Sequence, residues 1–313
     1  MSISQANVDQ LGPDHATPGC PVCGASSTAL EVAPNWGEWR LCDNCTLEFV
    51  HPLQLDETPV ELYSDAYKGK RGENRMQEFN DRLAARRAIL HKDPTLWFWT
   101  PAFERTFDWL EQRVGKGATV FEVGCGLGWV LHTLRARGFE AVGLDVAEDP
   151  VELNRADGFR VWHGTVDTVP DGWVEPDAIV AFFMLHHVQD PLAFAQTLHR
   201  RFPATPLSLA QYGPSNRDPL ASMPPRTLTR WNKASLETLL GRAGYDPEVT
   251  HVAGTGNESK LMRPIRKVVK RTISVPPVYR TARRIEQRFM PRVLTPIASE
   301  AHVVHALAEP AQT

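Results

Sequence analysis

Short apolar runs alternate with amphipathic segments through the middle of the chain. The apolar runs that we interpret as strands are residues 118–124, 140–146, 159–164, 176–183 and 206–212. Segments with apolar residues at helical spacing follow them at 128–138, 151–158, 190–201 and 233–244. Strand–helix alternation is typical of a parallel sheet with helices on both faces. We therefore expect an α/β fold with a Rossmann-like, doubly wound sheet over residues 116–257.

The segments on either side of this region have different patterns. Residues 19–60 contain three short β-like runs between cysteines and predict a small separate domain. Apolar positions at helical spacing over residues 61–115 predict a helical linker or lid. Residues 258–313 are basic, repeat apolar positions at helical spacing and predict a helical C-terminal extension. A length of 313 residues fits this multi-part organisation.

Charge is distributed unevenly along the chain. The net charge is only -3, yet the segment from Lys260 to Arg292 has eleven Lys or Arg and one acid, Glu286. A basic amphipathic segment of this kind binds an anionic membrane surface, or packs on an acidic body with its charges outward. Both alternatives stay open for residues 260–292.

No apolar run approaches the roughly 18–20 residues of a membrane span, and the N-terminus has no signal-peptide pattern.

A glycine-rich turn carries the strongest chemical signal. The strand at 118–124 leads into Gly124, Gly126 and Gly128, a helix follows, and the next strand ends at Asp145. Glycines allow a sharp turn and close approach of the backbone to a ligand, and the helix N-terminus attracts an anionic group. An acid at the end of the second strand is suited to the hydroxyls of a ribose. The arrangement predicts a nucleoside-containing ligand.

The segment E-V-G-C-G-L-G at residues 122–128 resembles the first motif of class I S-adenosylmethionine-dependent methyltransferases. The resemblance continues in the same order through residues 143–146, 163–170, 176–191 and 228–245. It implies S-adenosylmethionine as the cofactor, with its methionine end at the glycine loop, its ribose at Asp145 and its adenine beside Thr165 and Val166. The cofactor-binding residues that it implies are Glu122, Gly124, Cys125, Gly126, Gly128, Asp145, Val146, Thr165, Val166, Phe183 and Met184.

A methyl acceptor with an OH or activated CH group must lose a proton, and histidine titrates in the right range to take it. His186 and His187 follow the fourth predicted strand, near the edge where ligands bind in such sheets. Each is a candidate general base. In the family that the chain resembles, a histidine at the position of His187 is frequent whatever the substrate, so orienting the loop is the alternative role. The Pro-rich stretch 211–233 is expected to build the acceptor site; its Arg230 contacts an anionic group or is a solvated surface residue.

Four of the five cysteines form two pairs, Cys20 with Cys23 and Cys42 with Cys45. This is C-x-x-C spacing repeated across eighteen residues, typical of a zinc ribbon. Four thiolates complete a tetrahedral site with no position open for water, so the predicted zinc is structural. Free thiols, in a chain without an export signal, also indicate a reducing cytoplasm.

Together these features predict a cytoplasmic methyltransferase acting at O or C of a small-molecule or carbohydrate-like acceptor, peripheral at the membrane if the basic segment docks there. A zinc-ribbon RNA methyltransferase is one alternative, but residues 19–50 contain one Arg and no Lys, which makes a nucleic-acid partner unlikely. A non-catalytic S-adenosylmethionine-binding interaction protein is the other alternative. The complete glycine loop and Asp145 argue against it.

Overall fold

The computed structural model describes residues 18–33, 36–52, 101–214, 224, 227–252 and 303–311. Residues 61–100 of the predicted helical linker or lid, and the basic segment 260–292, lie outside these residues. Within the described part, no helix is long and apolar enough to cross a membrane.

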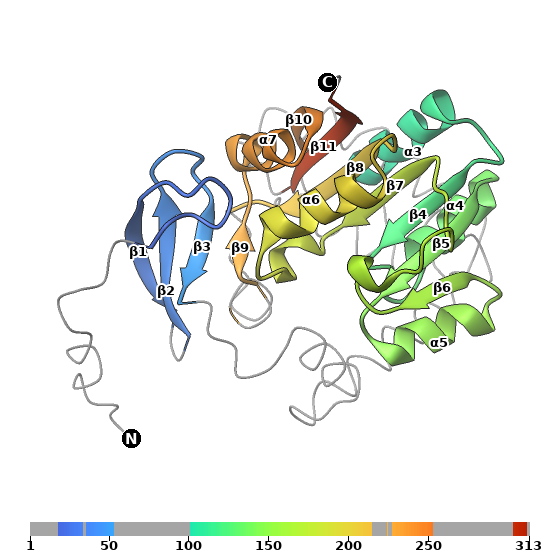
Figure 1. Cartoon of the computed structure of the whole chain (residues 1–313), viewed down its shortest axis with the longest axis horizontal. Coiled ribbons are helices and arrows are strands. Elements are labelled where there is room, and N and C mark those ends of the chain that lie inside the picture. Colours follow the sequence, from blue (N-terminus) through green and yellow to red (C-terminus); the bar gives the residue numbers. More distant parts are fainter. Residues whose placement is uncertain are drawn as a thin grey trace, which may run out of the picture.

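A seven-stranded sheet forms the centre of the protein (Figure 1), with the strand order β10-β11-β8-β7-β4-β5-β6. The strands are β4 (Thr119–Val123), β5 (Glu140–Asp145), β6 (Arg160–His163), β7 (Ala178–Phe182), β8 (Leu207–Tyr212), β10 (Tyr245–Val252) and β11 (Val303–Pro310). The pairs from β6 to β8 are parallel, whereas β11 runs antiparallel to both β8 and β10. The predicted doubly wound α/β fold is confirmed, and all five predicted strands are present.

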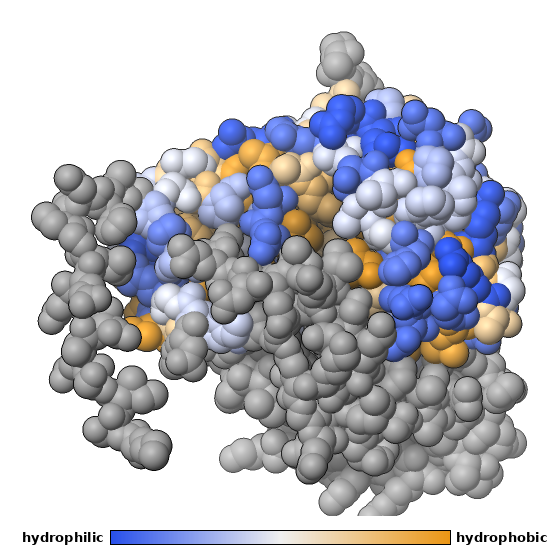
Figure 2. Space-filling view, turned by 60° about the horizontal axis from the view of Figure 1, so that its bottom comes forward, coloured by the Kyte–Doolittle hydropathy of each residue, from blue (hydrophilic) through white to orange (hydrophobic). Residues whose placement is uncertain are grey.

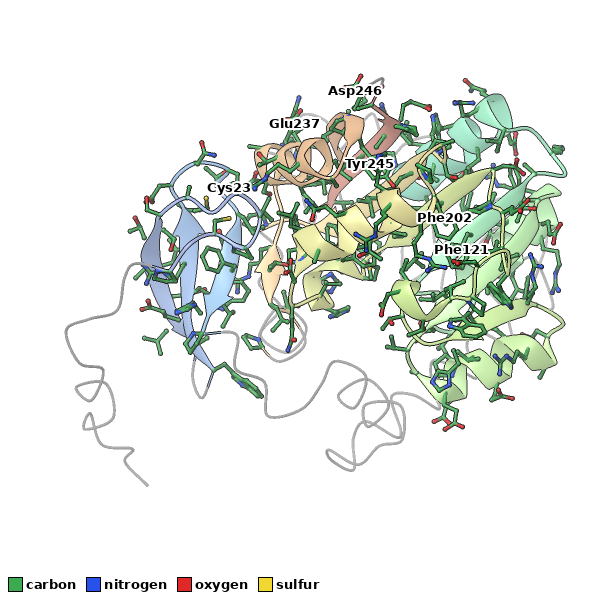
Figure 3. All side chains as sticks on the ribbon, in the orientation of Figure 1. Cys23, Phe121, Phe202, Glu237, Tyr245 and Asp246 are labelled. Carbon is green, nitrogen blue, oxygen red and sulfur yellow. The ribbon has the colours of Figure 1, made fainter. Side chains whose placement is uncertain are left out.

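Helices cover both faces of this sheet because side chains alternate along each strand. Phe121 and Ile179 belong to a buried cluster that includes residues of α6 and α7, whereas Val120 and Val180 belong to a second cluster with α3 and α4. Phe121 packs edge-to-face on Phe202 just after α6, with ring centroids 5.8 Å apart (Figure 3). The helices are α3 (Pro101–Arg113), α4 (Trp129–Arg137), α5 (Glu148–Ala156), α6 (Pro191–Arg201) and α7 (Lys233–Arg242), with short 3-10 turns η3 (Val166–Thr168) and η4 (Leu185–His187).

Strand β11 corrects the predicted C-terminal extension. Residues Val303–Pro310 do not belong to a helical appendage but form an internal strand between β8 and β10. His305 lies fully buried on this strand, and its Nε2 is 2.9 Å from Thr106 Oγ1 of α3 and 3.2 Å from Ser208 Oγ of β8. The basic segment is therefore part of a connection between two paired strands. Because Val252 is paired with Val303, and Val303 with Tyr212, this connection leaves the sheet at the edge where β8 ends.

The N-terminal ribbon is a second, four-stranded antiparallel sheet of order β1-β2-β3-β9. Its strands are β1 (Ser27–Ala33), β2 (Gly37–Cys42), β3 (Glu48–His51) and β9 (Thr229–Arg230). The first three match the β-like runs between the cysteines. The fourth comes from the stretch between β8 and α7, nearly 180 residues further along the chain, so the ribbon completes its sheet with a strand from the larger domain (Figure 1).

The described surface carries few large exposed apolar side chains. Leu30, Val32 and Tyr212 are those that stand out. On the face in Figure 2, apolar and polar residues are interspersed over the described part. Scattered apolar residues are usual on protein surfaces and need no partner; Tyr212 is different because it lies at the end of β8, next to the candidate site.

Candidate functional site

The glycine loop lies between the end of β4 and the start of α4. Gly124, Gly126 and Gly128 have φ angles of 79°, 46° and 78°, a left-handed conformation that glycine adopts without strain. The amides of Gly124 and Cys125 donate to the Leu144 carbonyl of β5, at 2.8 and 3.0 Å. The sequence thus forms the predicted tight turn between β4 and α4.

Asn154 supports this loop from below and was not indicated by the sequence. It is fully buried on α5, and its Nδ2 donates to the Gly126 carbonyl at 2.8 Å. A Cβ at Gly128 would lie 1.9 Å from Asn154 Oδ1, so only glycine fits there. The signal available in the sequence was a polar residue on the buried face of a helix. Cys125 is a small buried residue here, with its Sγ 3.8 Å from Asn154 Nδ2.

Asp145 ends β5 next to the loop. Its Oδ2 accepts from the Gly126 amide at 2.7 Å and its Oδ1 from the Ala147 amide at 2.9 Å. A carboxylate has about four lone-pair sites, so Asp145 retains the capacity to bind two ribose hydroxyls. Burial raises the pKa of Asp145, while the hydrogen bonds from Ala147 and Gly126 oppose that rise.

Glu122 is buried on β4 with Oε2 lacking a hydrogen-bond partner. Burial first, and then repulsion by Asp145, raise its pKa well above the usual value. An orphaned acidic oxygen beside a second buried acid fits a cationic ligand group. S-adenosylmethionine carries an ammonium, a sulfonium and a ribose diol, so the residues present suit it.

The predicted adenine side lies at the ends of β5 and β6. Val166 is buried at the start of η3, and the Thr165 amide donates to Thr168 Oγ1 at 3.1 Å. The Val146 carbonyl is 3.1 Å from His163 Nε2. These residues lie along the same edge of the sheet as Asp145, so the predicted adenine side adjoins the predicted ribose side. Their contacts with the cofactor remain predictions.

Two residues after β7 face opposite ways. Met184 lies against the glycine loop, since a Cβ on Gly124 would be 3.0 Å from Met184 Cβ. Phe183 instead stacks on Tyr212 of β8, with ring centroids 4.2 Å apart and planes 21° from parallel. Phe183 has φ 52°, an uncommon value for a bulky residue, and its amide donates to the Ala210 carbonyl at 2.8 Å. The sequence grouped both residues with the cofactor; the structure places Met184 beside the loop and Phe183 on the β8 side.

His186 and His187 lie next to each other on η4, with ring centroids 3.8 Å apart. His186 is buried, and its Nδ1 donates to Gln211 Oε1 at 3.2 Å; burial lowers its pKa to about 4. His187 is only partly buried. A buried histidine that is neutral near pH 7 and bonded to an amide is suited to holding the turn, whereas His187 is more accessible for proton transfer.

Two buried histidines make stability depend on pH. Burial lowers the pKa of His186 to about 4 and that of His305 to about 3, both below the ordinary 6.5. The unfolded chain therefore binds more protons between these values, and the stability that is fully present above pH 6.5 is lost as pH falls. We expect His186→Gln to reduce the slope of unfolding free energy against pH between 4 and 6.5 by up to about 1.4 kcal/mol per pH unit.

Urea unfolding at several pH values measures this slope. His305→Gln is the matched variant, because it removes the other buried histidine far from the cofactor loop and is expected to reduce the slope in the same direction. An unchanged slope in both variants would show that neither histidine is held neutral by the fold.

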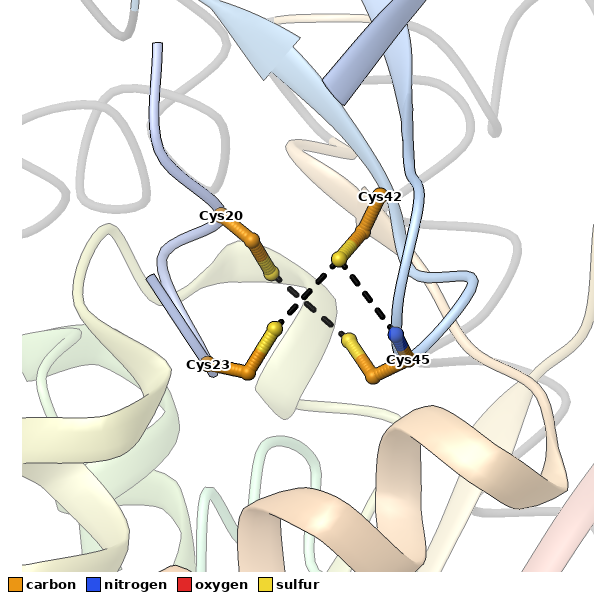
Figure 4. A group of neighbouring side chains, drawn as sticks. All are labelled: Cys20, Cys23, Cys42 and Cys45. Atoms are coloured by element: carbon orange, nitrogen blue, oxygen red, sulfur yellow. Dashed lines mark hydrogen bonds between the residues drawn. The ribbon is translucent and has the colours of Figure 1, made fainter. Parts of the chain in front are cut away.

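The four cysteines of the ribbon meet at one point (Figure 4). Their Sγ atoms all lie within 4.8 Å of one another; Cys20 and Cys45 are 3.6 Å apart, and Cys23 and Cys42 are 3.4 Å apart. A disulfide would require about 2.05 Å, whereas four sulfurs at about 2.3 Å from one tetrahedral zinc are nearly 4 Å apart. The predicted cluster is confirmed, and its geometry fits zinc.

Each C-x-x-C pair forms a similar knuckle. Amides of Val22 and Asn44 donate to Cys20 Sγ and Cys42 Sγ, both at 3.4 Å. The hydrogen bond from Cys45 lowers the pKa of the Cys20 thiol to about 5. Burial raises the pKa of the Cys42 thiol, and the amides of Asn44 and Cys45 oppose that rise. Amide donors stabilise thiolates, which are the form that binds metal. The site is closed by four protein ligands, so zinc here would hold the ribbon together and take no part in chemistry.

Comparison with known proteins agrees with this geometry. Residues 97–248 match the sequence model of a family described as a methyltransferase domain. Ribosomal protein L11 methyltransferase of Burkholderia vietnamiensis is 38% identical over 101 residues, covering 30% of this chain and 33% of that protein. Ubiquinone biosynthesis O-methyltransferase of Pseudomonas paraeruginosa is 30% identical over 101 residues, covering 30% of this chain and 44% of that protein.

The chain thus spans less than half the length of these curated relatives. Among solved structures, an S-adenosylmethionine-dependent methyltransferase from Mesorhizobium loti aligns with 71% of this chain and all of its own, at 15% identity and a TM-score of 0.46. The family match confirms the resemblance that the motifs indicated.

Proposed function

We propose that this chain, whose residues 97–248 match a methyltransferase domain, transfers a methyl group from S-adenosylmethionine to O or C of a small-molecule or carbohydrate-like acceptor. One observation carries the proposal. The glycine loop with Glu122 and Asp145 ends one pair of strands, and the turn with His187 ends the neighbouring strand at the same edge. Cofactor residues and a candidate base are therefore adjacent. The reduced thiols favour a cytoplasmic location.

Bound S-adenosylmethionine supplies an electrophilic methyl group on a sulfonium. The role of this chain's residues is to bind, align and remove a proton. Asp145 would bind the ribose hydroxyls, and Glu122 with the loop carbonyls would bind the cationic end. His187 would accept the proton that the acceptor loses as its O or C bonds to the methyl carbon, while the methyl–sulfur bond breaks and the sulfur leaves as a neutral thioether. His186 keeps η4 in place through its bond to Gln211 Oε1.

The acceptor is proposed to bind on the β8 side of this edge. Phe183 and Tyr212 form a stacked pair there, and Tyr212 is 39% exposed. The His186 ring lies edge-on to Tyr212 at 5.7 Å, so the pair adjoins η4. A flat aromatic surface beside a base suits an acceptor with a ring, because ring faces pack well on aromatic side chains. Strained backbone at Phe183 is typical of functional sites.

A macromolecular acceptor is the alternative, because one relative is named for methylation of ribosomal protein L11. Against RNA, Arg40 is the only Lys or Arg in residues 19–60. It is used internally: its Nε donates to Ser27 Oγ at 2.8 Å, and it pairs with Glu38. Two measurements separate these alternatives. Calorimetric titration with S-adenosylmethionine tests cofactor binding, and radiolabelled methyl transfer into nucleotide sugars, small hydroxylated metabolites, ribosomal protein and RNA tests the acceptor class.

Binding of S-adenosylmethionine with transfer into a small molecule supports the proposal. Absence of binding would overturn the enzyme function altogether. Transfer into protein or RNA alone would leave the methyltransferase activity and overturn the acceptor class.

His187→Gln is expected to lower kcat by about a hundredfold or more, because a general base contributes roughly 10²–10⁴ in rate. The Kd for S-adenosylmethionine should change little, since His187 is not among the residues assigned to the cofactor. Steady-state kinetics with the acceptor found above, together with calorimetry, measure both quantities. A kcat within threefold of wild type would show that His187 only orients the turn.

A further inference from the structure

We propose that the zinc ribbon is a positioning element for the candidate active site: Arg230 anchors residues 228–231 to the ribbon, and this segment holds the turn of His187 and the end of β8. The inference rests on the proposed function for its catalytic consequence. Its structural part stands independently of any activity.

The backbone of residues 228–231 bridges two sheets. On one side, Thr229 and Arg230 pair with Phe49 and Glu48 of β3, and the Val50 amide donates to the Leu228 carbonyl at 3.0 Å. On the other side, the Leu228 amide donates to the His186 carbonyl at 2.8 Å. The Trp231 amide also donates to the Tyr212 carbonyl, at 3.2 Å. One short segment thus connects the ribbon to both sides of the proposed acceptor site.

Arg230 explains why this segment adheres to the ribbon. The residue is only 3% exposed, and its Nη1 lies 3.0 Å from Glu48 Oε2 and 3.2 Å from Glu31 Oε1. Its guanidinium stacks 3.7 Å above the ring of Trp39, which is fully buried. From the sequence, we expected Arg230 either to contact an anionic group of the methyl acceptor or to be a solvated surface residue. The structure shows it in neither role. A buried cation with two acidic partners and an aromatic ring is held in one geometry.

The packing around the bridge leaves little freedom. Leu228 is 1% exposed and Trp231 is fully buried, with its Nε1 donating to Thr229 Oγ1 at 2.9 Å. Close-packed interiors transmit displacements because few voids absorb them. A shift of β3 therefore moves the His186 carbonyl, and with it the adjacent His187. Loss of the ribbon's metal would act through the same path.

Residue-resolved amide hydrogen exchange of the full chain tests the bridge without any acceptor. In Arg230→Met, exchange of the Leu228 amide is expected to accelerate by about tenfold or more, as a local opening of this segment becomes easier. Glu48→Gln is a milder second variant that keeps the fold if Arg230→Met does not, and it should accelerate the same amide to a smaller extent. Removal of zinc with a chelator should accelerate it as well, while amides of β4 and β5 keep their protection.

Arg242→Ala is the matched control. Arg242 also joins the larger domain to the ribbon, donating from Nη1 to the Val22 carbonyl at 2.9 Å, but this bond goes to the first cysteine pair and not to β3. In the Arg242→Ala variant, we expect the Leu228 amide to exchange at the same rate as in the wild type. Unchanged exchange at Leu228 in Arg230→Met or after chelation, or equal acceleration in Arg242→Ala, would overturn the bridge.

Kinetics test the positioning consequence. Arg230→Met and Glu48→Gln should lower kcat while KM for S-adenosylmethionine stays within about threefold, because the glycine loop is held by Asp145 and Asn154 instead. A variant with faster Leu228 exchange and unchanged kcat would overturn the positioning role. If no methyl transfer is found in the wild type, the proposed function fails, while the exchange result still decides whether the ribbon holds η4.

Discussion

Replacement of Gly128 with alanine is expected to raise the Kd for S-adenosylmethionine by about tenfold to a hundredfold, equivalent to roughly 1.4–2.8 kcal/mol. Two costs combine at this position. The φ angle of 78° is left-handed, and the new Cβ would lie 1.9 Å from Asn154 Oδ1. Asn154 cannot move aside without releasing the Gly126 carbonyl that it holds. The collision therefore displaces the backbone that we propose contacts the cofactor.

Gly115→Ala is the matched control for this prediction. Gly115 has φ 79°, almost the same conformation, but a Cβ there meets nothing within 4 Å. Both variants carry the left-handed cost of roughly 1–2 kcal/mol, so both should lose some thermal stability. Only Gly128→Ala should lose cofactor affinity. Equal affinities in calorimetry would refute the role assigned to the loop.

Replacement of Cys42 with serine should abolish zinc binding and unfold the ribbon. Its Sγ lies 3.4 Å from Cys23 Sγ and accepts amide hydrogen bonds from Asn44 and Cys45. A tetrahedral site with three thiolates binds zinc far more weakly, and structural zinc contributes about 10–16 kcal/mol of apparent binding free energy in isolated zinc-finger peptides. We expect metal analysis to find zinc in the wild type and almost none in the variant, with a lower Tm.

Cys125→Ser separates zinc loss from the general effect of losing a thiol. Cys125 is as buried as the ribbon cysteines but lies in the cofactor loop, beside Asn154. This variant is expected to keep its zinc, although a buried hydroxyl in place of the thiol lowers stability. Zinc retained in Cys42→Ser, or lost in Cys125→Ser, would contradict the assignment of the ribbon site.

Local patterns in the sequence were sufficient for much of the fold. The strands from β4 to β8 and the helices between them carry strong periodicity, and the two C-x-x-C pairs have a spacing that few other sites share. Strand β11 was not predicted because its residues, Val303–Pro310, lie 50 residues beyond β10, and periodicity carries no information about long-range pairing.

The residues of the candidate site also fall into those that a local pattern predicts and those that only long-range contacts reveal. Glu122, Asp145 and the glycines were identified because each follows directly from a strand end in a motif. Asn154 and Tyr212 were not, because a buried amide under a loop and a ring stacked on Phe183 are contacts between separate elements.

The sequence by itself determined that a Rossmann-like sheet carries a nucleoside-binding loop and that four cysteines form a metal site, because these features depend on neighbours within a few residues. Tertiary structure alone decided that the two parts are one unit. In the sequence, nothing distinguishes Arg230 from an ordinary arginine in a loop. Only the pairing of β9 with β3 buries it between Glu48 and Trp39. Packing between residues far apart in the chain decided that the charge of Arg230 is buried. It also decided that the His186 carbonyl, next to His187, accepts a hydrogen bond from the Leu228 amide.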